Sequence, residues 1–320
     1  MHKNLPMDPE LAPAYEAWRG AMKGGIDLND IPATRKLMAE LGAKLPKPAP
    51  VPGIRVQDMH APAPKGGKDV LVRIYRPEGN AKVPAVLWIH GGGYVLGDIE
   101  RDDGTCMNLA KFANCLIASV DYRLAPEHPF PAPLEDCYAA LKWLANSAAD
   151  LGIDKSRIVV SGASAGGGLA AGLALLARDR GEIKLKGQML IYPMIDDSNV
   201  APATAERPDT LLWTRENNRV GWLSYLGVPP GSAGVSPHAA ATRATDLAGL
   251  PPAYISVGDI DLFRDEDIAY AQRLLAAGIP TELHVYPGGY HGFNGIVPNS
   301  GIAKRFNGDR DEALKRMLHG

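Results

Sequence analysis

The chain has 320 residues, 46% of them hydrophobic, and its 34 Lys and Arg nearly balance its 36 Asp and Glu. This length and hydrophobic content favour one large core with an appendage, and the absence of a basic block argues against nucleic acid as a partner. No secretory signal pattern and no run of 18 apolar residues is present, and the three cysteines lack a CxxC spacing, so we expect a cytoplasmic protein without membrane insertion.

Two helices and an extended linker are predicted for the first 50 residues. Helical periodicity runs from Glu10 to Met22 and from Ala33 to Leu41. The segment from Leu45 to Gly53 then carries a proline at every second position from 46 to 52, which is typical of an extended chain. We therefore expect residues 1–50 to form N-terminal cap helices and a linker.

From residue 51 onward, short apolar runs alternate with helical stretches. The runs predict strands at Val70–Tyr75, Ala85–Ile89, Leu116–Asp121, Ile158–Ser161, Met189–Tyr192, Tyr254–Val257 and Glu282–Tyr286. The stretches between them predict helices at Gly104–Phe112, Pro133–Ala145, Ala165–Arg178 and Phe263–Ala277. This alternation is typical of an α/β protein with a mostly parallel central sheet flanked by helices. We expect that domain to comprise residues 51–195 and 236–320.

One interval breaks the alternation, because about sixty residues separate Tyr192 from Tyr254, too many for a plain crossover. The interval contains Trp213, Trp222 and Tyr225. An insertion that carries aromatic residues could fold over the mouth of the sheet, so residues 196–235 are predicted to form a cap insertion. A simple packing elaboration is the alternative.

The segment Gly162-Ala163-Ser164-Ala165-Gly166 stands between an apolar run and an Ala- and Leu-rich stretch, so it predicts a strand, a sharp turn and a helix. Such a turn exposes a serine hydroxyl at a helix N-terminus, where free backbone N–H groups can stabilise negative charge. Ser164 is therefore a candidate nucleophile. An ordinary turn of small residues is the alternative interpretation.

Acidic and histidine candidates follow later predicted strands. Asp259, Asp261, Asp265, Glu266 and Asp267 crowd one loop and helix start, and most of them are expected to be solvated residues that favour the helix dipole. In open parallel sheets, functional groups gather beyond the carboxyl ends of the strands. A serine, an aspartate and a histidine in this chain order are expected of an α/β hydrolase.

Two histidines compete for the role of base. His284 falls inside a predicted strand, where a surface role or a satisfied core role is expected. His291 follows that strand in a loop flanked by glycines, which can direct the imidazole inward. We therefore favour His291.

The run His90-Gly91-Gly92-Gly93 follows another predicted strand. It matches neither GxGxxG nor the P-loop, so a phosphate cradle is disfavoured. Backbone N–H groups without neighbouring Cβ atoms suit an oxyanion that must be approached closely.

These motifs together resemble the hormone-sensitive-lipase family of α/β hydrolases, the bacterial family IV esterases. The resemblance covers roughly residues 70 to 295. It rests on His90–Gly93, on Asp121–His128 with Phe130–Ala132, on Gly162–Gly167, on Asp261–Glu266 and on His291–Phe293. It implies an α/β-hydrolase fold with a helical cap. Ala163 and Leu262 depart from the family pattern, and Ala163 leaves the subfamily and its substrate preference open.

The resemblance also implies roles for individual residues. Ser164 would be the nucleophile, Asp261 the acid and His291 the base, and the N–H groups of Gly91, Gly92 and Ala165 would bind the oxyanion. His90 would orient the glycine loop. Arg123 and Glu127 would brace it from below, with their charges paired if they are buried. The expected substrate-pocket residues are Tyr94, Tyr192, Trp213 and Phe293.

The predicted function is a serine carboxylesterase that hydrolyses short- to medium-chain acyl esters through an acyl-enzyme, without metal or cofactor. The expected partner is a small-molecule ester, and a homodimer is possible. An amidase, a lactonase or a xenobiotic deacetylase with the same triad is one alternative. A non-catalytic small-molecule receptor on the same fold is another.

Overall fold

The computed structural model describes residues 5–22, 25–44, 46–63, 67–79, 81–200 and 212–320. Eight strands form one sheet in the order β1-β2-β4-β3-β5-β6-β7-β8. The pairs β1·β2 and β2·β4 are antiparallel, and all other neighbours are parallel. The strands are β1 (Ile54–Ala61), β2 (Val70–Pro77), β3 (Val83–Ile89), β4 (Leu116–Val120), β5 (Ile153–Ala163), β6 (Gly187–Ile191), β7 (Ala253–Gly258) and β8 (Thr281–Tyr286).

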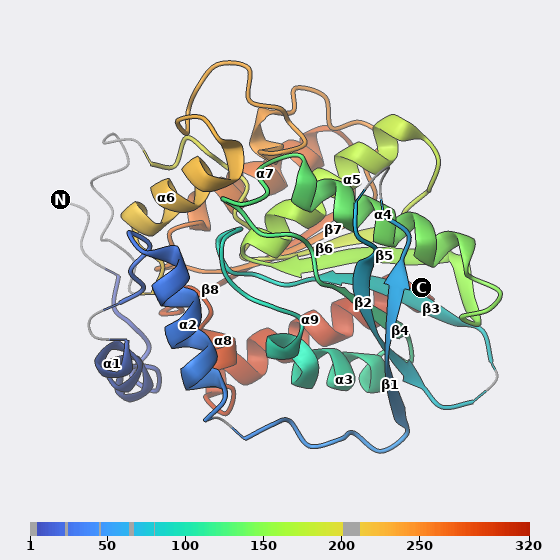
Figure 1. Ribbon diagram of the computed structural model, residues 1–320, viewed down its shortest axis with the longest axis horizontal. Helices are drawn as coiled ribbons and strands as arrows, with labels where there is room; N and C mark the ends of the chain where they lie inside the picture. The colour runs from blue at the N-terminus through green and yellow to red at the C-terminus, as the bar shows by residue number, and fades with distance from the viewer. Residues whose placement is uncertain (1–4, 23–24, 45, 64–66, 80, 201–211) are drawn as a thin grey trace.

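Helices cover both faces of the sheet. In Figure 1, α4, α5 and α7 lie on one face, whereas α3 and α9 lie on the other. The helices α1, α2 and α6 gather at one end of the molecule (Figure 1). The α-helices are α1 (Ala12–Ala21), α2 (Ile31–Gly42), α3 (Asp103–Phe112), α4 (Ala132–Asn146), α5 (Ala165–Arg180), α6 (Arg215–Leu226), α7 (Arg264–Ala276), α8 (Phe293–Ile296) and α9 (Gly301–His319).

Strands β3, β4, β6 and β7 are buried along their whole length because both of their faces are covered. In β3, Ala85, Leu87 and Ile89 belong to one hydrophobic cluster, whereas Val86 and Trp88 belong to a second cluster across the sheet. A continuous apolar run is therefore the expected pattern for such a strand. The first half of β5 departs from this pattern, because Asp154, Lys155 and Arg157 stand there and are at least partly exposed.

The parallel strands end at a common edge. The last residue of β3, Ile89, is level with Gly162 of β5, and Ala163 is level with Ile191 of β6. At the far side, Gly258 of β7 is level with Tyr286 of β8. The loops that carry the candidate residues therefore leave the sheet side by side.

The predicted α/β-hydrolase fold is confirmed, and every predicted strand and helix is present with adjusted ends. The sequence interpretation missed β1, α6, α8 and α9. Part of the predicted cap insertion, residues 201–211, lies outside the described residues. Within the described ranges, no helix combines the length and the apolar character needed to cross a membrane.

Candidate active site

Ser164 occupies a strained turn between β5 and α5. Its φ is 59° and its ψ is −124°, a conformation that non-glycine residues rarely adopt. Three hydrogen bonds hold its backbone. Its N–H donates to the Ile191 carbonyl at 2.9 Å, and its carbonyl accepts from the N–H groups of Gly168 at 2.9 Å and Met194 at 3.0 Å. A Cβ at Gly166 would overlap the Ile89 carbonyl, so glycine allows α5 to begin directly against the end of β3. The predicted sharp turn is present.

The side chains of Ser164, His291 and Asp261 form a continuous hydrogen-bonded chain. The Ser164 Oγ lies 2.9 Å from His291 Nε2, and His291 Nδ1 lies 2.8 Å from Asp261 Oδ2. The other oxygen of Asp261, Oδ1, accepts the Phe263 N–H at 3.0 Å. All three residues are at least 93% buried. A serine bound to an imidazole that a carboxylate orients in turn can transfer its proton and attack a carbonyl.

The glycine loop lies directly beside this serine. A Cβ built on Gly91 would come within 2.8 Å of the Ala163 carbonyl and 3.2 Å of the Ser164 Cβ. Gly92 has a φ of 129°, which L side chains rarely adopt. Among the described residues, no hydrogen bond uses the N–H of Gly91, Gly92 or Ala165. Three donors are thus left without a partner in the described part of the chain, and two of them belong to Gly91, which packs against Ser164, and to Ala165, which follows it.

His90 is buried beneath the glycine loop and faces the loop backbone. Its Nδ1 lies 2.9 Å from the Gly91 carbonyl oxygen, and its ring stacks on Tyr122 with centroids 4.3 Å apart. The Tyr122 hydroxyl donates to the His90 carbonyl at 2.9 Å. Burial lowers the pKa of His90, which favours a neutral imidazole. His90 therefore supports the loop and makes no hydrogen bond to Ser164.

Comparison with known proteins shows the family of this chain. The profile of the alpha/beta hydrolase fold family matches residues 86–295. The chain belongs to this family. Esterase LipI of Mycobacterium tuberculosis is 39% identical to this hydrolase, over 98% of the present chain and 96% of LipI. Carboxylesterase NlhH of the same organism is 39% identical over 79% of the chain and 80% of NlhH. The solved structure of a bacterial heroin esterase matches with a TM-score of 0.90 at 41% identity, and 98% of each chain is covered.

The predicted ion pair between Arg123 and Glu127 of the hydrolase does not form. Arg123 instead contacts Asp136 of α4, with Nη2 2.7 Å from Oδ1, and Glu127 binds Arg35 of α2 at 2.7 Å. The Arg123 and Glu127 side chains are 41% and 52% exposed, so the burial that would force them to pair is absent.

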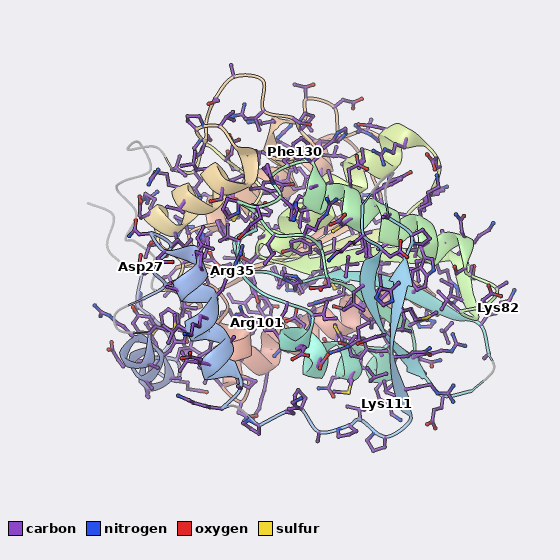
Figure 2. The ribbon with its side chains drawn as sticks, viewed as in Figure 1. Asp27, Arg35, Lys82, Arg101, Lys111 and Phe130 are labelled. Carbon is purple, nitrogen blue, oxygen red and sulfur yellow. The ribbon has the colours of Figure 1, made fainter. Side chains whose placement is uncertain are left out.

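Arg35 supports the segment after the glycine loop instead. It projects from α2 (Figure 2), and its Nε donates to the Val95 carbonyl at 2.7 Å while its Nη2 donates to the Ala125 carbonyl at 2.8 Å. The Ala125 N–H in turn donates to the Tyr94 carbonyl at 3.0 Å. The sequence contained no local signal for this contact, because sixty residues separate Arg35 from Val95.

Two of the four predicted pocket residues lie in the protein core. Tyr94 is fully buried, donates its hydroxyl to the Met194 carbonyl at 2.8 Å and stacks on Tyr225 of α6. Phe293 is also fully buried and packs edge-on against Phe306. Neither side chain is exposed in this structure, and the pocket role of both residues stays a prediction.

The other two predicted pocket residues lie next to the site. The indole of Trp213 packs against Gly93 of the glycine loop, and the ring of Tyr192 lies against His291 with centroids 4.8 Å apart. Both side chains are almost completely buried.

Among the described residues, no group of three His, Cys, Asp or Glu could hold a metal ion.

The acidic residues around Asp261 are less solvated than expected. Asp259 accepts the Gly288 N–H at 2.6 Å and so faces the loop after β8. Glu266 is buried and accepts hydrogen bonds from the Ile195 N–H and the Asn199 amide, at 2.9 and 2.7 Å. The prediction of solvated residues is therefore wrong for Glu266. Glu266 lies on the side of α7 that faces the core, which composition alone could not indicate.

Asp267 contradicts the same prediction more strongly. It is fully buried, and neither of its carboxyl oxygens has a hydrogen-bond partner among the described residues. Burial raises the pKa of Asp267 well above its usual range, and the charges of Glu266 and Asp261 raise it further. A carboxyl with a raised folded-state pKa keeps its proton after the unfolded chain has lost it. Its contribution to stability is therefore complete below a pH of about 4 and is lost as the pH rises through the folded pKa.

We expect Asp267→Asn to stabilise the enzyme increasingly as the pH rises. The variant removes the proton linkage, so its gain in free energy of unfolding should grow by up to about 1.4 kcal/mol per pH unit above pH ~4. Urea unfolding at a series of pH values between 4 and 8 measures this gain. Asp265→Asn is the matched control, since Asp265 is partly exposed and paired with Arg264, and it should change stability by less than about 1 kcal/mol. A gain that does not vary with pH would contradict the expectation.

Proposed function

We propose that this carboxylic-ester hydrolase acts through an acyl-enzyme on Ser164, with His291 as the base and Asp261 as the acid that orients it. The observation that carries the proposal is the unbroken hydrogen-bonded chain from Ser164 Oγ through both ring nitrogens of His291 to Asp261. Esterase relatives at 39% identity support the reaction class. The ordered motifs of the chain support membership of the hormone-sensitive-lipase family within the α/β hydrolases.

The proposed reaction has two halves. Ser164 Oγ attacks the ester carbonyl carbon while His291 Nε2 takes the hydroxyl proton, and the oxyanion accepts hydrogen bonds from the N–H groups of Gly91, Gly92 and Ala165. The C–O bond then breaks as His291 gives its proton to the leaving alcohol. Water loses a proton to His291, attacks the acyl-enzyme and releases the acid, and Ser164 recovers its proton. Asp261 stabilises the imidazolium in both halves.

The proposed substrates are esters with short to medium acyl chains. We propose that residues 1–50 and 196–235 form a cap over the site, since Arg35 of α2 binds the segment after the glycine loop and Trp213 packs on Gly93. A large side chain directly against the oxyanion loop leaves limited room for an acyl group. The similarity to a bacterial heroin esterase favours a second candidate, the deacylation of a bulky xenobiotic ester by the same triad.

A rate profile over acyl length tests the proposal. p-Nitrophenyl esters from acetate to palmitate should give the largest kcat/KM at short or medium length, and matched anilides should react far more slowly. Highest activity on long-chain emulsions would overturn the substrate proposal. Equal rates on esters and anilides would favour an amidase. A serine-reactive phosphonate should label one site, and failure to label would favour a receptor.

A further inference from the structure

Tyr192 lies inside the segment that holds the backbone of Ser164. It directly follows Ile191, whose carbonyl accepts the Ser164 N–H, and it precedes Met194, whose N–H donates to the Ser164 carbonyl. The φ of Tyr192 is 36°, a value that costs a bulky residue of order 1–2 kcal/mol. Its own N–H is fixed to the Ser256 carbonyl at 2.6 Å. The surrounding structure thus imposes an unfavourable backbone conformation that directs the Tyr192 ring toward the site.

The ring of Tyr192 packs against one side of the His291 imidazole. The two rings are 4.8 Å apart between centroids and meet at 69°. A second ring, that of Phe263, approaches the same imidazole at 5.0 Å and 90°. Phe306 of α9 stacks behind Tyr192 at 5.8 Å. Edge-to-face packing of this kind restrains the plane of the imidazole, while the hydrogen bonds to Ser164 and Asp261 fix its two nitrogens.

The hydroxyl of Tyr192 is anchored in a chain of buried side chains. It donates to Asn294 Oδ1 at 3.0 Å, and Asn294 Nδ2 donates to Asn307 Oδ1 at 3.0 Å. Asn294 lies in α8, three residues after His291, and Asn307 lies in α9. Tyr192 and Asn294 are both more than 90% buried. These hydrogen bonds therefore connect the Tyr192 ring, which packs on His291, to the segment that carries His291 itself.

We propose that Tyr192 is a positioning residue that acts through His291 and that Asn294 anchors it. This role rests on the proposed function, in which His291 takes a proton from Ser164 and delivers it to the leaving alcohol. The imidazole must stay within hydrogen-bond reach of both oxygens, and a displacement of about 1 Å can cost about 10²-fold in rate. The hydroxyl of Tyr192 already donates its proton to Asn294, so it is not available as a donor to a substrate.

Steady-state kinetics of Tyr192→Phe and Tyr192→Leu test the proposal. The Phe variant keeps the ring and loses the anchor, so kcat should fall about tenfold while KM stays within about twofold. The Leu variant loses the aromatic ring that packs on His291, and kcat should fall about 10²-fold. Asn294→Leu should lower kcat at least as much as Tyr192→Phe, because it removes the same hydrogen bond together with the bond to Asn307. Adding Tyr192→Phe to Asn294→Leu should lower kcat no further, because their shared hydrogen bond is already lost.

Tyr270→Phe is the matched control. Tyr270 is a fully buried tyrosine of α7 whose hydroxyl has no hydrogen-bond partner in the described part of the chain, and its variant should keep kcat within about twofold. A raised KM with unchanged kcat in Tyr192→Phe would overturn the positioning role and make Tyr192 a substrate contact. An unchanged kcat and KM would overturn it as well. Ser164→Ala is assayed in parallel. Activity that survives in Ser164→Ala overturns the proposed function. If activity requires Ser164 but kcat is unchanged in Tyr192→Phe, only the positioning role is overturned.

Discussion

Ser164→Ala is expected to lower kcat by about 10⁴-fold or more, with the fold intact. The variant removes the only atom that can form the acyl bond and leaves the backbone hydrogen bonds to Ile191 and Met194 in place. Alanine has the same backbone preferences at this positive φ, so the strained turn is not relieved. Residual hydrolysis above the rate in water should remain, because the N–H groups of the glycine loop still stabilise an oxyanion. Initial rates on a short-chain ester and the burst of acyl-enzyme measure the loss.

Ser161→Ala is the matched control for this experiment. Ser161 lies three residues earlier in β5, is fully buried, and its hydroxyl has no hydrogen-bond partner among the described residues. Its loss should leave kcat within about twofold of the parent enzyme. If Ser164→Ala kept most of its esterase activity, the acyl-enzyme mechanism would be wrong. Unfolding curves of both variants separate loss of chemistry from loss of structure.

The residues of the candidate triad could be located from the sequence because each one follows a recognisable strand. Parallel strands end at one edge, so a serine after β5, an aspartate after β7 and a histidine after β8 come together without any knowledge of long-range contacts. The glycines around Ser164 carried a local signal of the same kind. A Cβ at Gly166 would overlap the backbone of β3, so the close approach is encoded in one residue type.

Contacts between distant segments could not be read from local patterns. Arg35 reaches the loops after the glycine motif from α2, and the acidic run after Asp261 gave no sign that Glu266 and Asp267 turn toward the core. Several acids at a helix start favour the helix dipole in either orientation, so the sequence could not distinguish a solvated acid from a buried one. Tyr94 and Phe293 stand beside the site in the sequence, yet both point into the core.

The elements that the sequence interpretation missed differ in the strength of their sequence signal. The edge strand β1 pairs only with β2 and exposes four residues in succession, so its apolar pattern is weak. The helix α9, in contrast, buries Ile302, Phe306, Leu314 and Leu318, which have spacings of four and eight residues. That spacing is a helical signal, and helical periodicity over residues 301–319 would have revealed it.

Asp261→Asn is expected to lower kcat by about 10⁴-fold, through the imidazole and not through any contact with the substrate. Asp261 Oδ2 accepts a hydrogen bond from His291 Nδ1 at 2.8 Å, which keeps Nε2 free to take the Ser164 proton. An amide can present its NH₂ group to Nδ1 instead, which favours the tautomer with the proton on Nε2. That tautomer cannot act as a base toward Ser164. Because Asn and Asp have nearly the same volume, packing around the site is preserved.

Asp259→Asn tests whether Asp261 has been assigned correctly. Asp259 is two residues away on the same loop, but its Oδ1 accepts the Gly288 N–H at 2.6 Å, and an asparagine oxygen can accept the same bond. We therefore expect kcat within a few-fold of the parent enzyme, since no interaction with His291 is changed. A severe loss in Asp259→Asn together with normal activity in Asp261→Asn would transfer the acid role to Asp259.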